Sequence, residues 1–77
     1  MVRYDGAEAR KHRIEEIARK ILSSLQKDGQ LSLSKTVAEI QYDQGLTKEK
    51  IMEYLEILDQ LDRFVLDKDN DKIKKVE

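Results

Sequence analysis

Few residues of this chain have the type and spacing that enzyme or metal chemistry requires. The 77 residues include no Cys and a single His, His12, so neither a zinc–thiolate set nor a catalytic triad is assembled from them. The three glycines, Gly6, Gly29 and Gly45, stand alone and form no phosphate-binding loop. Carboxylates are plentiful, but no two of them stand out as a general acid and base. We therefore expect a non-enzymatic protein with no catalytic residue, cofactor or metal.

Basic side chains are the group most suggestive of a ligand, and they concentrate near the N-terminus. Residues 1–27 hold seven basic against four acidic side chains, a net charge of +3, with the densest run at residues 10–13. Such a run contacts phosphates or forms a solvated helix face, and the two interpretations weigh equally here. A second group of lysines surrounds a polar turn near the C-terminus. The candidate nucleic-acid contacts are Arg3, Arg10, Lys11, Arg13, Lys48, Lys50, Lys72 and Lys74.

Helical periodicity defines the element that carries the N-terminal charges. The helix is expected to begin near Asp5 or Gly6, with Asp5 capping the first turn, and to end at Asp28 and Gly29. Residues 1–13 lack the apolar period, so they form either a basic N-terminal arm or an extension of this helix. Residues 14–77 form the single domain. The apolar residues at the i, i+3, i+4 spacing of one helix face are Ile14, Ile17, Ala18, Ile21, Leu22 and Leu25.

Two shorter helices are predicted in the middle of the chain. Leu31-Ser32-Leu33 alternates as a short strand, and Ser34 is placed to cap the helix that follows it. Gly45 is expected to end that helix, and Thr47 to cap a third helix that continues to about residue 62. Tyr42, like Tyr54 and Phe64, falls at a position compatible with the core. The residues expected to be buried are Ile17, Ile21, Leu25, Val37, Ile51, Leu55, Leu58 and Phe64.

A β-hairpin is predicted at the C-terminal end. Residues 64–66 and 72–76 are prone to form strands, and residues 68–71 are a polar tip rich in turn formers. If Leu66 pairs with Ile73, Phe64 lies opposite Lys75, and a bulge or a slipped register is the alternative. The fold class expected from these elements is mainly α with a small β wing.

The order of elements resembles that of a winged helix-turn-helix domain. The resemblance covers residues 14–76 and depends on Val37-Ala38, the turn Gly45-Leu46-Thr47, and the pair Leu55 and Leu58 before a hairpin. One departure is the segment between the third helix and the wing, where Asp62-Arg63 stands in place of the glycine often found there. The resemblance implies three helices, a short strand and a wing. It also implies nucleic-acid binding, with the third helix in the major groove and the wing on the backbone.

The charge of the third helix disagrees with that implied role. Residues 48–62 hold two lysines against five carboxylates, a net charge of −3. A duplex repels such a helix unless only its N-terminal tip, with Lys48 and Lys50, enters the groove. The carboxylates fall opposite the apolar positions of the helix and suggest a surface for a protein partner. The candidate protein-partner contacts are Glu49, Glu53, Glu56 and Gln60.

Two functions are therefore expected, one of them preferred. The preferred one is an accessory or assembly subunit in DNA replication or transcription, whose acidic third helix contacts a larger protein while its basic arm and wing contact the nucleic-acid backbone. The alternative is a dimeric DNA-binding transcriptional regulator that reads the major groove with the tip of the third helix. The expected partners are thus a larger protein of such a complex and double-stranded DNA, with a homodimer as a further alternative.

Composition supports a soluble chain without membrane contact. Charged residues make up 40% of the sequence, the net charge is −1, and proline is absent. No apolar run approaches the roughly 20 residues that a membrane-spanning helix needs. No secretory signal is visible at the N-terminus either, so we expect a cytoplasmic location. The density of Lys and Glu is compatible with a thermophilic or archaeal source.

Overall fold

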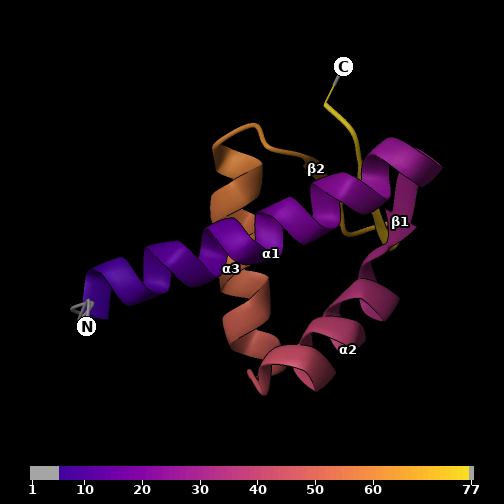
Figure 1. The fold of residues 1–77 in the computed structure, drawn as a ribbon. Coiled ribbons are helices and arrows are strands. Elements are labelled where there is room, and N and C mark those ends of the chain that lie inside the picture. The colour runs from indigo at the N-terminus through magenta and orange to yellow at the C-terminus, as the bar shows by residue number, and fades with distance from the viewer. Residues whose placement is uncertain (1–5, 77) are drawn as a thin grey trace.

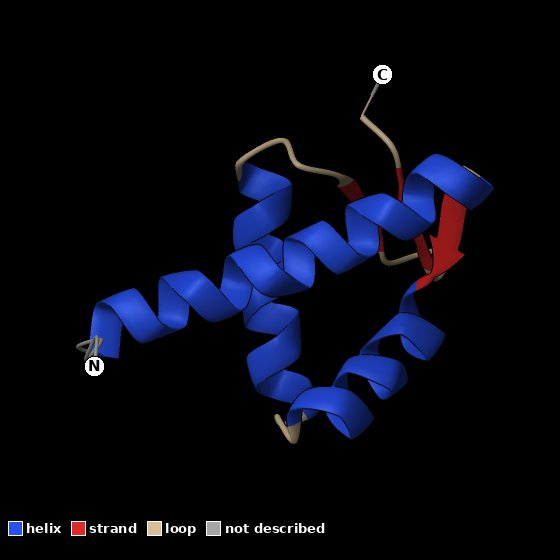
Figure 2. Ribbon diagram, viewed as in Figure 1, coloured by secondary structure: helices blue, strands red, loops and turns tan. Residues whose placement is uncertain are grey.

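The computed structural model describes residues 6–76 and folds them into three helices and a small three-stranded sheet (Figures 1 and 2). Arg3 and Asp5 lie outside the described residues, so the expected cap and contact at these positions are not placed. None of the described helices is long and apolar enough to cross a membrane. In chain order the elements are α1 (Gly6–Asp28), β1 (Gln30–Ser32), α2 (Leu33–Gln44), α3 (Lys48–Gln60), β2 (Val65–Asp67) and β3 (Lys72–Lys74).

The sheet joins β1, which follows α1, to the C-terminal hairpin of β2 and β3. Its strand order is β1-β3-β2, and both pairings are antiparallel. Leu31 and Leu66 both lie opposite Ile73, as predicted for Leu66. Because side chains alternate across a strand, these three apolar residues share the face that packs on the helices. The hairpin prediction is confirmed in its register, although each strand is only three residues long.

One apolar core lies between the three helices and the sheet, and α1 crosses α3 near the middle of α1 (Figure 1). All eight residues expected to be buried are buried. Ile51, Leu55 and Leu58 recur at helical spacing and give α3 one apolar face. No described polar or charged residue is buried, so the core is wholly apolar.

The boundary predicted between the strand and α2 is wrong by one to two residues. The strand ends at Ser32, not at Leu33, and Leu33 is already the first residue of α2. Ser32 is the N-cap, because its hydroxyl accepts a hydrogen bond from the backbone N–H of Lys35 at 3.3 Å. Ser34 was the expected cap, but its N–H and hydroxyl both donate to a carboxylate of the hairpin. A long-range contact that sequence spacing does not reveal therefore decides the boundary.

Two further expectations about helix positions have definite outcomes. Tyr42 is not in the core: its exposed fraction is 91%, and Ile40 takes the inward position on α2 beside Val37. The predicted end of α2 at Gly45 and the predicted start of α3 at Thr47 are both confirmed. Gly45 ends α2 in the left-handed conformation with φ 68°, and Thr47 caps α3 by accepting the N–H of Lys50 at 3.2 Å.

Residues 6–13, which the sequence left as an arm or a helix extension, are the first two turns of α1. Gly6 and residues 8–13 are exposed, and Ile14 is the first buried residue of the helix. The start of α1 therefore runs past the body of the domain, as Figure 1 shows. We call residues 6–13 the overhang. It lengthens the molecule, whose dimensions are 40 × 24 × 21 Å.

Candidate nucleic-acid and protein interfaces

The overhang carries the basic side chains that are most accessible. Arg10, Lys11 and Arg13 are all exposed and have no hydrogen-bond or ion-pair partner in the described part of the chain. Arg10 precedes Ile14 by one helical turn, and Arg13 precedes Ile17 by the same interval. These cations are thus free to meet an anionic ligand without first breaking a contact.

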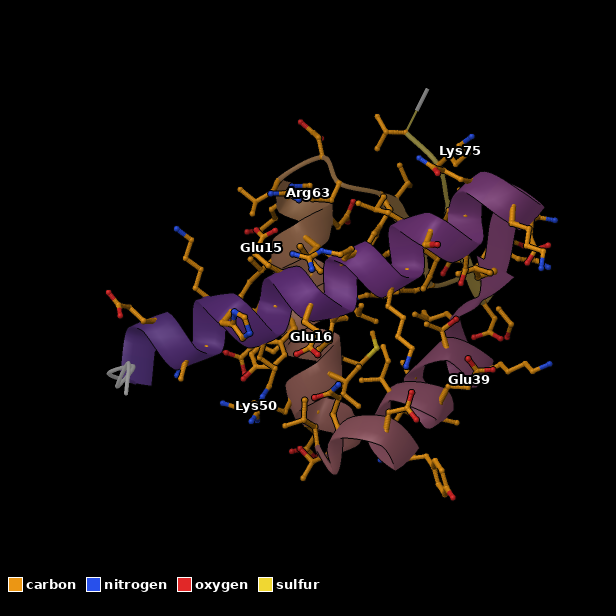
Figure 3. The ribbon with its side chains drawn as sticks, in the orientation of Figure 1. Glu15, Glu16, Glu39, Lys50, Arg63 and Lys75 are labelled. Carbon is orange, nitrogen blue, oxygen red and sulfur yellow. The ribbon has the colours of Figure 1, made fainter. Side chains whose placement is uncertain are left out.

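The N-terminal tip of α3 contributes less positive charge than its sequence suggests. Lys48 is exposed, whereas Lys50 is half-buried and contacts the following turn of its own helix. Its ammonium lies 3.8 Å from a carboxylate oxygen of Glu53 and 5.9 Å from the centre of the Tyr54 ring. Both contacts oppose the use of Lys50 as a phosphate ligand. Figure 3 shows Lys50 beside α3, on the side of that helix toward the overhang.

Lysines of the hairpin are also paired within the domain. Lys74 lies 3.2 Å from Asp67 on the neighbouring strand, and Lys68 of the turn pairs with Glu56 of α3. Lys72 is half-exposed and has no ion-pair partner among the described residues. Of the two lysines predicted for the wing, Lys72 is therefore available and Lys74 is partly neutralised.

The tip of the hairpin is tied to the start of α2 by one carboxylate. Asp71 Oδ1 accepts the backbone N–H of Ser34 at 2.9 Å and its hydroxyl at 2.6 Å. Asp71 Oδ2 accepts the hydroxyl of Ser32 at 3.1 Å, and the backbone carbonyl of Asp71 accepts the N–H of Leu33 at 2.9 Å. Together with Lys68–Glu56, these bonds hold the hairpin tip against two helices. The tip does not extend freely from the domain.

Hydrogen bonds at the hairpin lower the pKa values of two carboxyl groups. The hydroxyl of Ser34 is the main cause for Asp71, whose pKa lies below its ordinary value. For Asp67 the main causes are the side-chain amide of Asn70, at 2.8 Å, and the ammonium of Lys74, which together hold its pKa down. Both groups therefore favour the charged form in the folded hairpin.

The predicted protein-partner contacts form one exposed stripe on α3. All four lie on the side of the helix opposite Ile51, Leu55 and Leu58, and all four are exposed. One of them, Glu56, is held by Lys68, whereas Glu49 has no ion-pair partner among the described residues. We call this set the acidic stripe; it comprises Glu49, Glu53, Glu56 and Gln60.

Two ion pairs between distant elements were not predicted. Arg63, after α3, makes a two-pronged contact with Glu15 of α1, with nitrogen–oxygen distances of 3.0 and 3.4 Å (Figure 3). Lys20 of α1 pairs with Asp43 of α2. The partners are 48 and 23 residues apart, so no local spacing indicates either pair. Both pairs use charges that the sequence alone leaves as free surface groups.

Hollows on the described surface are shallow and have mixed linings. One of about 270 Å³ lies between α1 and α2, with Ile21 and Ile40 at its floor and Lys20 and Glu39 at its rim. A wider groove of about 880 Å³ runs over the outer face of the sheet beside Val65 and Lys74. No group of His, Asp and Glu in residues 6–76 is arranged to hold a metal ion. The charged surfaces are therefore the candidate sites.

Comparisons with protein-family models, with curated proteins and with solved structures found no match to this chain. The arguments for function therefore depend on the geometry and charge of the domain itself.

Proposed function

We propose that the domain is a winged helix. The order of its elements, α1-β1-α2-α3-β2-β3, and a sheet in which β3 lies between β1 and β2 support this assignment. In a winged helix, α3 is the helix that enters a DNA groove and the β2–β3 hairpin is the wing. The surfaces of these two elements therefore decide between the functions.

The proposed function is that of a non-enzymatic accessory subunit in DNA replication or transcription, acting in the cytoplasm. The acidic stripe of α3 contacts a basic surface of a larger protein, and the overhang contacts the nucleic-acid backbone. The observation that carries the proposal is the position of the acidic stripe, which occupies the outermost face of α3 directly opposite its buried residues. That face is the one that a groove-binding helix would present to phosphates and bases.

Pairing of the lysines strengthens the preference for a protein partner on α3. Lys50 and Lys68 each contact one carboxylate of the acidic stripe. Entry of α3 into a groove would bring Glu49 and Glu53 toward phosphates with only Lys48 free to compensate. A basic protein surface instead gains from the same carboxylates through charge complementarity.

The wing supports the same preference. In the winged-helix domains that this chain resembles, the wing touches the nucleic-acid backbone or the minor groove. Here Asp71 holds the tip against the start of α2, and Lys74 is paired with Asp67. Backbone contact is therefore assigned mainly to Arg10, Lys11 and Arg13 of the overhang, with Lys72 as the free lysine of the wing.

A co-purification experiment tests the assignment of the acidic stripe. Tagged parent protein is compared with the Glu49→Lys/Glu53→Lys variant and with a matched control, Asp28→Lys/Glu39→Lys, which changes the net charge equally at exposed sites on α1 and α2. We avoid Glu56 because its reversal would remove the pair with Lys68, which joins α3 to the hairpin, whereas the Lys50–Glu53 pair lies within α3 itself. The parent and the control are expected to retain the same basic partner from the source organism, and the stripe variant to lose it. Equal retention by all three proteins would contradict the proposal.

A further inference from the structure

The overhang continues the packing face of α1 beyond the body of the domain. Ile14, Ile17 and Ala18 face the core, and Ile14 is the first residue of α1 to be buried. Arg10 precedes Ile14 by four residues, and Lys11 precedes Ala18 by seven, so both lie on the same side of the helix as the buried residues. The side of α1 that packs on α3 is therefore basic in the overhang, where α1 extends beyond α3.

The length of the overhang is suited to covering one further helix. Eight residues of α-helix extend about 12 Å at about 1.5 Å per residue. Two packed helices have axes about 8–10 Å apart, so the overhang spans the width of a single neighbouring helix. Figure 1 shows no other helix or strand of residues 6–76 beneath that part of α1. The basic side of the overhang thus faces an open position next to α3.

The acidic stripe offers a surface of the opposite charge and of helical shape. Glu49 and Glu53 lie one turn apart on α3, and Arg10 and Lys11 lie next to each other on the packing side of the overhang. Exposed opposite charges on the surfaces of two helices favour their association. Within one molecule the two surfaces cannot meet, because the acidic stripe faces away from the core and the basic side of the overhang lies toward it.

We propose that two copies of this chain form a two-fold homodimer in which the overhang of each copy lies across the acidic stripe of the other. A two-fold axis makes the contact reciprocal, so that each dimer contains two identical overhang–stripe contacts. The contact pairs Arg10 and Lys11 of one copy with Glu49 and Glu53 of the other. Formed by exposed charges, it is weak and strongly dependent on salt.

The dimer covers the same two surfaces that the proposed function uses. A basic protein surface and a nucleic-acid backbone therefore compete with self-association. The dimer forms when neither of these ligands is bound. The inference itself does not depend on the proposed function, because it follows from the charges and geometry of one chain. It is tested with the purified protein alone, whereas the proposed function is tested by partner capture.

A charge-swap experiment tests the dimer. Sedimentation equilibrium is measured over a concentration series for the parent, for Arg10→Glu/Lys11→Glu, for Glu49→Lys/Glu53→Lys, and for an equimolar mixture of the two variants. Each variant alone places like charges at both contacts, whereas the mixed dimer restores opposite charges at both. A control, Lys35→Glu/Lys75→Glu, has the net charge of the first variant, with the changes at exposed residues outside both surfaces.

We expect the parent and the control to associate at low salt. Each variant alone should associate at least about tenfold more weakly than the parent. The mixture should recover the association of the parent, and about 1 M salt, where the Debye length is about 3 Å, should abolish it. A parent that is monomeric throughout the series would overturn the proposal. So would undiminished association of either variant, or a mixture no stronger than its components while thermal melting shows both variants folded.

Discussion

At the scale of single residues, Asp71 connects more of the chain than any other described side chain. Its carboxylate accepts three hydrogen bonds from Ser32 and Ser34, and its backbone is in the left-handed region with φ 55°. Asp and Asn adopt this conformation more readily than other residues with a side chain. The residue type thus satisfies the turn of the hairpin and the start of α2 together.

Replacement of Asp71 by Asn tests the charge at this position without disturbing its backbone. The pKa of Asp71 is lowered below its ordinary value of 3.8 in the folded protein, chiefly by the hydroxyl of Ser34. A lowered pKa stabilises the folded state above that ordinary value, and this contribution disappears as the pH falls through the folded-state pKa. Asp71→Asn should therefore lower the melting temperature at neutral pH and reduce the loss of stability on acidification toward pH 3.

Asp69 supplies the matched control for that measurement. It lies two residues away in the same turn, is exposed, and has no hydrogen-bond partner among the described residues. Asp69→Asn should leave the melting temperature nearly unchanged. An equal melting temperature for Asp71→Asn and the parent at neutral pH would show that the negative charge of Asp71 contributes nothing to stability.

Leu55 tests the core at the same scale. It has no exposed surface and lies on the apolar face of α3 between Ile51 and Leu58. Leu55→Ala should lower the free energy of unfolding by about 2–5 kcal/mol, because it removes buried apolar groups and leaves a cavity. Leu61, which is 57% exposed just after α3, is the control, and Leu61→Ala should change it by less than about 0.5 kcal/mol. Urea unfolding measures both, and equal effects would contradict the burial of Leu55.

At the scale of elements, the three helices differ in how much of their form follows from local sequence. The apolar period of α1 and α3 predicts their length and their buried faces, because both depend on spacing within the helix. The start of α2 does not follow in this way, since Asp71 takes the hydrogen bonds of Ser34 and leaves Ser32 as the cap. Tyr42 is exposed because Ile40, two residues earlier, occupies the inward position.

The candidate surfaces show the same division. The exposure of the acidic stripe was predicted, since it depends only on the helical period of α3. Pairing of Lys68 and Lys74 was not predicted, because it depends on which charges the fold brings together. Lys50 and Glu53 alone have a spacing, i and i+3, from which a pair is expected.

The overhang is the element whose contribution to nucleic-acid binding is most separable. Arg10→Ala/Lys11→Ala should weaken binding to all duplex sequences alike, because phosphate contacts carry no sequence information directly. Loss of two such contacts should also reduce the slope of log affinity against log salt concentration by about 1.8. Fluorescence anisotropy over a salt series measures both quantities. Lys27→Ala/Lys35→Ala is the control. An Arg10→Ala/Lys11→Ala variant that binds as tightly as the parent would exclude a role for the overhang.

At the scale of the whole molecule, charge is distributed so that opposite signs occupy different surfaces. The overhang presents free cations beyond the core, and α3 presents carboxylates on its outer face. The pairs Glu15–Arg63 (Figure 3) and Lys20–Asp43 join α1 to the rest of the domain. We propose that this arrangement orients the domain between an acidic and a basic ligand, in keeping with the accessory role proposed above.

The central claim is that the acidic stripe of α3 lies outside any nucleic-acid groove. A duplex titration over a salt series tests it most directly, with Glu49→Lys/Glu53→Lys compared against Asp28→Lys/Glu39→Lys of equal net charge. Both variants attract a polyanion more strongly than the parent at long range, so only a local contact separates them. Our account predicts the same gain in affinity and the same salt slope for the two variants. A larger gain for the stripe variant, with a slope steeper by about 1.8, would contradict it and place α3 in the groove.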